Sequence, residues 1–270
     1  MKATMKRLIR LVAPVAVRRW WRHQFGWRWF RGNYATWSEA RAASAGYDDA
    51  AVLDRMLGAA RAVRSGRVAW DRDGATFAEP AVHAPLLAAL RTVAAAQGGR
   101  LELVDFGGAL GSTWWQYRPS LAGLATVRWR VVEQPHVAAA GRREFADTVL
   151  SFHDSLDDAL AGAAPAAILL SSVLPYVEAP HALVADVLRR GFKHLIIDRT
   201  AFVTKGSERL AIQRVPPALG GGSYPCWLFE RRSLLAPVEQ GYRLAAEWPG
   251  FDDFGPGVAF RGFLYERKGP

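Results

Sequence analysis

Cysteine is almost absent from this chain of 270 residues, and metal-binding motifs are absent with it. Cys226 is the single cysteine, so no disulfide can form within one chain. The six histidines do not combine with it at a spacing that is typical of a metal site. We therefore expect a protein of a reducing compartment, the cytoplasm, that holds no metal.

Long hydrophobic runs are also missing. The longest uncharged run near the start, Leu11 to Val17, has seven residues and contains Pro14, whereas a helix that spans a bilayer needs about 20. A secretory signal would end in small residues at a cleavage site, but Arg18 and Arg19 follow here. The sequence therefore predicts neither a membrane span nor a cleaved leader.

Acidic residues are absent from the start of the chain, and this explains the formal net charge of +10. Residues 1–31 hold nine Lys and Arg and no acid, while the other 239 residues hold 26 basic against 25 acidic side chains. A nucleic-acid-binding protein needs a basic stripe on its folded surface, and a nearly neutral body does not supply one. We therefore expect no nucleic-acid partner.

The basic segment 1–31 is interleaved with aromatic residues, among them Trp20, Trp21 and Trp27. This combination is typical of a segment at a membrane surface, where cations meet anionic headgroups and indoles lie at the boundary. The same aromatics could instead pack on the body of the protein, with the arginines in solvent. The composition does not separate peripheral membrane contact from packing, so both interpretations stay open.

Residues 32–99 show mainly helical patterns. Thr36 followed by Glu39 is the pattern of a capping box, and apolar residues recur at helical spacing farther on. The turn residues Asp71 to Gly74 lie between two short apolar runs, which predicts a hairpin. We expect a helical lid or cap region with a helix from Thr36, helices over 48–63 and 81–97, and a hairpin over 67–79.

Residues 100–270 alternate between strand and helix patterns. Apolar runs such as Ala166 to Leu170 are typical of strands that helices cover on both faces. The segment therefore predicts an α/β domain: a doubly wound, Rossmann-like sheet, mostly parallel, with a terminal antiparallel hairpin, preceded by the helical N-terminal segment. The expected strands cover 101–106, 127–133, 148–152, 166–172, 193–198, 242–248 and 258–267.

The turn after the first of these strands is rich in glycine. It contains Asp105, Gly107, Gly108 and Gly111, and in a doubly wound sheet ligands bind beyond the carboxyl ends of the strands. Glycines let the backbone approach a ligand and present helix N-terminal amides to it. Glu133 ends the next strand, where a carboxylate can accept both hydroxyls of a ribose. These positions together indicate a cofactor that contains a nucleoside.

Asp105 separates two kinds of nucleoside cofactor. An acid at this point would repel the pyrophosphate of a nicotinamide cofactor, and the spacing also departs from G-x-G-x-x-G. S-adenosylmethionine has no phosphate and carries a sulfonium and an ammonium group, which a carboxylate attracts. The sequence therefore favours S-adenosylmethionine, and a nicotinamide-dependent oxidoreductase is the weaker alternative.

On these residues the chain resembles the class I S-adenosylmethionine-dependent methyltransferases over about residues 100–267. It resembles more narrowly a family of methyltransferase-like proteins encoded among bacterial surface-polysaccharide genes, over nearly the whole chain. The resemblance implies methyl transfer to a hydroxyl or amine of a sugar or polysaccharide precursor. A non-catalytic, methyltransferase-like scaffold at the membrane is another alternative. The narrower resemblance lies in residues 32–34, 37–40, 46–48, 72–73, 105–108, 132–134, 197–200 and 223–225.

Further site candidates follow the later strands. Asp154 could bind the adenine amino group or cap the next helix, and Ser171 could face the cofactor or serve only as a turn residue. Asp198 and Arg199 end the fifth strand at the expected crevice, so we expect catalytic roles for them. Tyr176 and His181 lie where an acceptor could lose a proton, although a lone histidine at a helix start is more often structural.

Overall fold

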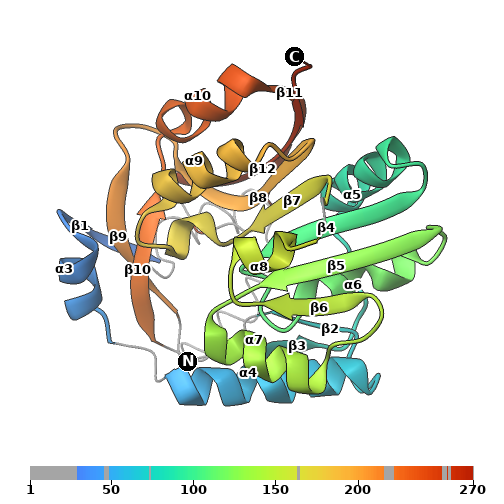
Figure 1. Cartoon of the computed structure of the whole chain (residues 1–270). Helices are drawn as coiled ribbons and strands as arrows, with labels where there is room; N and C mark the ends of the chain where they lie inside the picture. Colours follow the sequence, from blue (N-terminus) through green and yellow to red (C-terminus); the bar gives the residue numbers. More distant parts are fainter. Residues whose placement is uncertain are drawn as a thin grey trace, which may run out of the picture.

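One large sheet organises the molecule. The structure is a computed structural model that describes residues 29–45, 49–72, 74–162, 165–215, 222–250, 254 and 257–269. Its main sheet has seven strands in the order β11-β12-β8-β7-β4-β5-β6 (Figure 1). The strands are β4 (Arg100–Phe106), β5 (Thr126–Val132), β6 (Leu150–His153), β7 (Ala167–Ser171), β8 (His194–Val203), β11 (Tyr242–Pro249) and β12 (Val258–Arg267).

The strand directions confirm the expected mostly parallel, doubly wound sheet. β4 pairs in parallel with both β5 and β7, and the parallel pairing continues to β6 on one side and β8 on the other. β12 is antiparallel to both of its neighbours, β8 and β11. The terminal hairpin is therefore present, and its second strand lies inside the sheet, between β8 and the edge strand β11.

Helices cover both faces because residues in these strands alternate between two cores. Leu103 and Leu169 face one core, and their neighbours Val104 and Ile168 face the other. α4 (Asp49–Arg64), α5 (Ala84–Ala96), α6 (Ser112–Leu121) and α7 (Pro135–Glu144) cover the first face. α8 (Leu156–Leu160), α9 (Pro180–Arg190) and α10 (Arg231–Gly241) cover the second. The apolar runs of the sequence are thus explained by burial on both sides.

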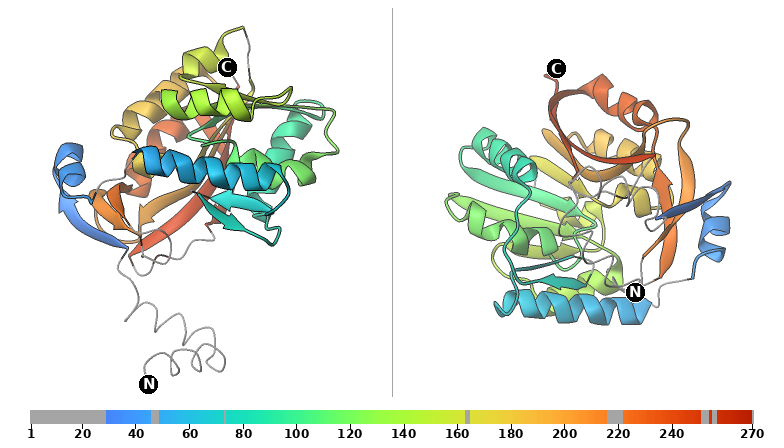
Figure 2. Two further views of the ribbon diagram at one scale, coloured as in Figure 1. Left: turned by 90° about the horizontal axis from the view of Figure 1, so that it is seen from below. Right: turned by 180° about the vertical axis from the view of Figure 1, so that it is seen from behind.

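A second, small sheet was not expected from the sequence. β1 (Phe30–Tyr34), β9 (Arg209–Arg214) and β10 (Ser223–Leu228) form an antiparallel sheet in the order β1-β9-β10. Figure 2 shows the blue β1 and α3 (Trp37–Ala42) beside the orange β9 and β10. β1 pairs with β9 across most of the chain, and β10, which pairs with β9 locally, contains Pro225, a residue that is unusual in strands.

β1 begins inside the basic segment defined as residues 1–31. Trp29 and Phe30 pack on Phe254, with ring centroids 4.5 and 5.8 Å apart, so this end of the segment contacts the body of the protein. Residues 1–28, which carry the expected membrane contact, lie outside the described residues. Within the described ranges, no helix has both the length and the apolar character needed to cross a membrane.

Residues 32–99 combine the expected helices with the expected hairpin. Thr36 caps α3, and its hydroxyl accepts the backbone N–H of Glu39 at 3.2 Å. β2 (Trp70–Arg72) and β3 (Ala75–Phe77) pair as a hairpin, which confirms that prediction. α4 and α5 pack into the same core as the main sheet. Much of this region is therefore part of the domain body, and its action as a lid stays a prediction.

Two helical glycines give a matched test of this packing. A Cβ on Gly141 in α7 would lie 2.4 Å from the Phe152 ring, whereas a Cβ on Gly58 in α4 would meet nothing within 4 Å. Gly141→Ala should lower the free energy of unfolding by about 1–3 kcal/mol through overpacking. Gly58→Ala should raise it by about 0.5–1 kcal/mol through helix propensity. Urea denaturation measures both, and equal effects would show that α7 does not pack on β6 as described.

Candidate functional site

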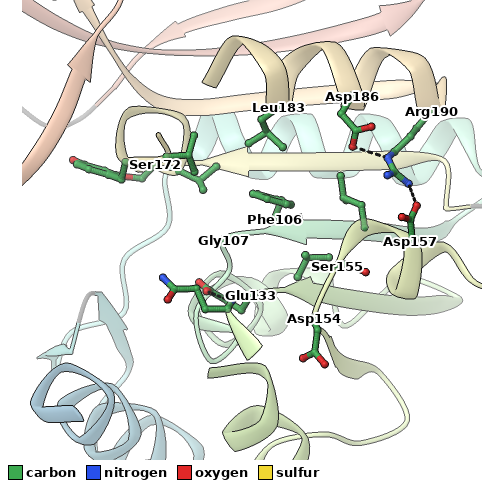
Figure 3. Close-up of a pocket in the computed structure, with 16 residues that line it drawn as sticks. Phe106, Gly107, Glu133, Asp154, Ser155, Asp157, Ser172, Leu183, Asp186 and Arg190 are labelled. Carbon is green, nitrogen blue, oxygen red and sulfur yellow. Dashed lines mark hydrogen bonds and ion pairs between the residues drawn. The ribbon is translucent and has the colours of Figure 1, made fainter. Parts of the chain in front are cut away.

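A pocket of about 630 Å³ lies beyond the carboxyl ends of β4, β5 and β7 (Figure 3). From β4 the chain continues to β5 and β6 on one side and then crosses to β7 and β8 on the other, so the pocket lies at the point where the strand order reverses, as expected. Phe106, Val132 and Val173 supply apolar walls. Its charged lining residues are Glu133, Asp154, Asp157, Asp186 and Arg190.

The glycine turn after β4 is shaped by contacts on both of its sides. Gly107 lines the pocket with φ of +75°, and a Cβ there would lie 2.5 Å from the Val173 side chain. A Cβ on Gly108 would lie 2.6 Å from Oδ2 of Asp105. Gly111 caps the start of α6. Gly107 is thus the glycine of this turn that faces the pocket, while Gly108 leaves room for a buried acid behind it.

Glu133 joins the turn after β5 to the turn after β4. Its Oε1 accepts the backbone N–H of Ala109 at 3.1 Å, and its Oε2 accepts that of Gln134 at 2.9 Å. Burial raises the pKa of Glu133, and these two hydrogen bonds oppose that rise. Each carboxylate oxygen can accept a second hydrogen bond. Glu133 therefore has acceptor capacity left for a ligand in the pocket.

Asp105 lies beneath the glycine turn and does not line the pocket. Its side chain is 1% exposed, and Oδ2 accepts the indole N–H of Trp129 at 2.9 Å. Burial raises the pKa of Asp105 to about 7, the Trp129 bond lowers it, and the charge of Glu133 raises it. The expected contact of Asp105 with the cofactor stays a prediction. Any influence of Asp105 on a ligand in the pocket would act through the glycine turn.

The outer end of the pocket is built from ion pairs. Asp154 lines the pocket and pairs with Arg142 through oxygen–nitrogen distances of 2.9 and 3.3 Å. Ser155, not Asp154, caps α8, so the capping alternative for Asp154 is wrong. Arg190 joins Asp157 at 2.8 Å to Asp186 at 2.9 Å and so connects α8 with α9 (Figure 3).

The expected catalytic residues are divided between the pocket and its surroundings. Tyr176 lines the pocket, and its hydroxyl donates to Oε1 of Gln213 at 2.7 Å. His181 pairs with Glu208 at 2.8 Å. In α9 it lies about 200° around the helix from Leu183, which lines the pocket. The structure therefore brings Tyr176, and not His181, to this pocket.

Ser171 ends β7, whereas Asp198 and Arg199 lie in the middle of β8. β8 continues to Val203, so the expectation that these two residues end the fifth strand is wrong. Asp198 is fully buried, and its carboxylate accepts the Ser171 hydroxyl at 3.1 Å. Ser172 lines the pocket in place of Ser171. Arg199 is half-buried and has φ of +48°. The expected roles of Ser171 in cofactor binding and of Asp198 and Arg199 in catalysis stay predictions.

Three non-glycine residues with left-handed backbones mark this edge of the sheet. Ala109 follows β4, Ser172 follows β7 and Arg199 lies in β8, with φ between +48° and +57°. These strands are adjacent in the order β8-β7-β4. Such conformations cost free energy and concentrate at functional sites. No composition or periodicity signal in the sequence identifies these three left-handed residues. Gln213, the partner of Tyr176, was also missed, because β9 was not predicted.

No family model matches the chain, and no curated protein matches it. Solved structures do match, and they include the N-terminal domain of EvdMO1 with S-adenosylhomocysteine bound, at 16% identity, 77% coverage of this chain, 97% coverage of that chain and a TM-score of 0.48.

Two further matches carry methyltransferase names. CalS10, an amino pentose methyltransferase from Micromonospora echinaspora, is 15% identical, covers 77% of this chain and 96% of its own, and has a TM-score of 0.44. Magnesium protoporphyrin IX methyltransferase from Synechocystis PCC 6803 is 14% identical, with coverages of 95% and 99% and a TM-score of 0.43. At these identities and TM-scores the matches assign no activity to this chain. The strand order places this chain among Rossmann-like folds.

Asp105 makes the stability of the protein depend on pH. An ordinary aspartate has a pKa of about 3.9, so between about pH 4 and the native pKa of about 7 the folded chain holds a proton that the unfolded chain releases. The free energy of unfolding should therefore fall as pH rises through this window, by up to about 4 kcal/mol. The Asp105→Asn variant should not show this fall in the free energy of unfolding.

Denaturant titrations of the parent and of Asp105→Asn between pH 4 and pH 8 measure the effect. Subtracting the two curves removes the contribution of the other titrating groups. Trp129→Phe should move the fall to higher pH, because the indole bond lowers the pKa of Asp105. A difference curve without slope between pH 4 and pH 7 would contradict the buried environment of Asp105.

Proposed function

We propose that the pocket binds S-adenosylmethionine and that the chain transfers its methyl group to a small-molecule or glycan acceptor. The observation that supports this best is the Glu133 carboxylate, bonded to Ala109 of the glycine turn at the reversal of strand order. A ribose placed there could donate its hydroxyl protons to Glu133, while the backbone at Gly107 leaves room for the rest of the ligand.

The charge of the pocket favours this cofactor over a nicotinamide dinucleotide. The pocket is lined by four carboxylates and by one basic side chain, Arg190, which is already paired with Asp157 and Asp186. Acidic walls repel a pyrophosphate and attract a sulfonium or an ammonium group. The apolar side chains of Phe106, Leu156 and Val173 suit a flat base.

Positioning would supply most of the catalysis. When bound, S-adenosylmethionine supplies a methyl group on a sulfonium, which a nucleophile can displace without further activation of the cofactor. The chain must then hold the acceptor atom in line with that methyl group. Tyr176, at the edge of the pocket and bonded to Gln213 of the small sheet, is the phenol best placed to orient an acceptor hydroxyl or amine. We take a sugar or polysaccharide precursor as the acceptor class.

Calorimetric titration tests the cofactor assignment. The parent should bind S-adenosylmethionine and S-adenosylhomocysteine, and Glu133→Ala should weaken both by about 10- to 1000-fold through the loss of two charge-assisted hydrogen bonds. Glu102→Ala is the matched control. Glu102 lies in the same sheet, near the start of β4, and pairs with Arg130 at 3.6 Å. Equal affinity in Glu133→Ala, or tight binding of NADH by the parent, would remove the assignment.

The basic N-terminal segment adds a separate proposal of peripheral membrane contact. Each Lys or Arg that reaches an anionic surface contributes about 1 kcal/mol, and salt screens this attraction. Full-length protein should therefore sediment with anionic vesicles in low salt. Deletion of residues 1–28, which spares β1, should abolish sedimentation. A full-length protein that ignores such vesicles would leave only the packing of Trp29 and Phe30 on the body.

A further inference from the structure

β8 contains one extra residue opposite β12. Thr200 pairs with Arg261 and Ile197 pairs with Phe263, so Asp198 and Arg199 together face the single residue Gly262. This two-against-one count is a β-bulge, a feature that redirects a side chain and is often found beside active sites. The left-handed backbone of Arg199, with φ of +48°, lies within it. The bulge therefore sets where the Arg199 side chain can point.

Trp248 reaches the bulge from the edge strand β11. It pairs with Gly262, and a Cβ on that glycine would lie 2.0 Å from the indole nitrogen. The indole thus occupies the space that a side chain at residue 262 would fill, and it donates its N–H to Oδ1 of Asp198 at 2.9 Å. Oδ2 accepts the Ser171 hydroxyl from β7. The Asp198 carboxylate therefore ties β11, β8 and β7 together.

Arg199 is not among the residues that line the pocket, but its bulge is hydrogen-bonded to one that is. The backbone N–H of Ser172, which lines the pocket, donates to the carbonyl oxygen of Asp198 at 2.9 Å. The pKa of Tyr117 in α6 is raised to about 12, mainly by burial; the charge of Asp198 contributes to the rise and the charge of Arg199 opposes it. Arg199 is therefore within electrostatic reach of α6 as well as of the end of β7. This is the carboxyl edge of the central strands, where ligands of doubly wound sheets bind.

We infer that Arg199 binds oxygen atoms of the methyl acceptor, and that Asp198 is a positioning residue which acts through Arg199 by holding the bulge with Trp248 and Gly262. The inference rests on the proposed function for the identity of the reaction. A guanidinium group donates hydrogen bonds in a fixed plane and accepts none, so its partners are the hydroxyl, carboxylate or phosphate oxygens of an acceptor.

The hydrogen bonds of the Asp198 carboxylate allow its positioning role to be distinguished from acid–base catalysis. The carboxylate is fully buried and both of its oxygens accept hydrogen bonds. An asparagine could still accept the Trp248 N–H and could donate to the Ser171 hydroxyl oxygen. Asp198→Asn should therefore preserve the bulge but would remove an acid–base group. Trp248→Phe should disturb the bulge but keep the acid–base group, because it removes the indole N–H that bonds to Asp198 and leaves the carboxylate ionisable.

Crystal structures of the full chain test the positioning role without an acceptor. The left-handed Arg199 should be present in the parent and in Asp198→Asn, and it should be displaced in Trp248→Phe. Gly262→Ala gives a second route, since the added methyl group must move the indole. Thermal denaturation shows whether Trp248→Phe and Gly262→Ala fold. If one of them does not, the crystal structure of the other decides the test. An unchanged Arg199 in both Trp248→Phe and Gly262→Ala would overturn the positioning role.

Kinetics test the contact with the acceptor. Labelled S-adenosylmethionine is incubated with nucleotide sugars and polysaccharide fragments, and the acceptor that is methylated is titrated. Arg199→Ala should raise the acceptor KM by about 10- to 100-fold and leave the affinity for S-adenosylmethionine unchanged. Asp198→Ala and Trp248→Phe should raise the same KM, and Asp198→Asn should recover most of the loss.

The outcomes distinguish this inference from the proposed function. Loss of turnover in Asp198→Asn with normal turnover in Trp248→Phe would make Asp198 an acid–base residue and overturn its positioning role. An unchanged acceptor KM in Arg199→Ala would overturn the acceptor contact. A parent that binds no S-adenosylmethionine would instead count against the proposed function, and the crystal structures would still decide whether Trp248 and Gly262 hold the bulge.

Discussion

The hydrogen bond from the Ala109 backbone to Glu133 connects the two turns on which the pocket depends. It fixes the turn after β4 against the turn after β5, and both carboxylate oxygens are held by backbone N–H groups. The left-handed Ala109 and the close approach of Gly107 to Val173 follow from the same local geometry. The part of the pocket at the glycine turn is therefore shaped by the backbone, and the Glu133 carboxylate lies there, where a ribose-like ligand could use it.

Two buried carboxylates support the central strands in the same way. Asp105 in β4 accepts the indole N–H of Trp129 from β5, and Asp198 in β8 accepts that of Trp248 from β11, both at 2.9 Å. Each acid is nearly or fully buried. Burying a carboxylate costs free energy unless hydrogen-bond donors satisfy it. Each indole N–H therefore reduces the cost of burying its aspartate and also links two strands. We therefore assign to Asp105 and Asp198 first a structural role, the linking of neighbouring strands, and treat any role in binding or catalysis as secondary.

The sequence predicted the main sheet well because inner strands such as β7 and β8 are buried on both faces and carry continuous apolar runs. It did not predict the small sheet, because β1 pairs with β9 from the far part of the chain and neither strand has a long apolar run. In the site, Gly107, Glu133, Asp154 and Tyr176 were predicted and do line the pocket. The indole partners of Asp105 and Asp198 were missed, because an acid at the end of a strand shows the same sequence pattern whether it faces a ligand or a buried tryptophan.

His181 does not line the pocket, although its helix was predicted. Its position at the start of a helix after β7 was predicted, but the face of α9 that meets the pocket is set by Leu183, Asp186 and Arg190. A helix start can be identified from sequence to within a few residues, whereas the direction of one side chain needs the helix phase relative to the sheet. Specific contacts of this kind depend on tertiary packing, which no local pattern contains.

Mass spectrometry of the small molecules that copurify with the full-length protein tests the central claim most directly. The protein is purified without added ligand, denatured, and its released nucleosides are identified, with a second sample incubated with S-adenosylmethionine before desalting. The account predicts S-adenosylmethionine or S-adenosylhomocysteine, at about one molecule per chain in the incubated sample. A nicotinamide dinucleotide in the first sample, or no retained nucleoside in either, would contradict it.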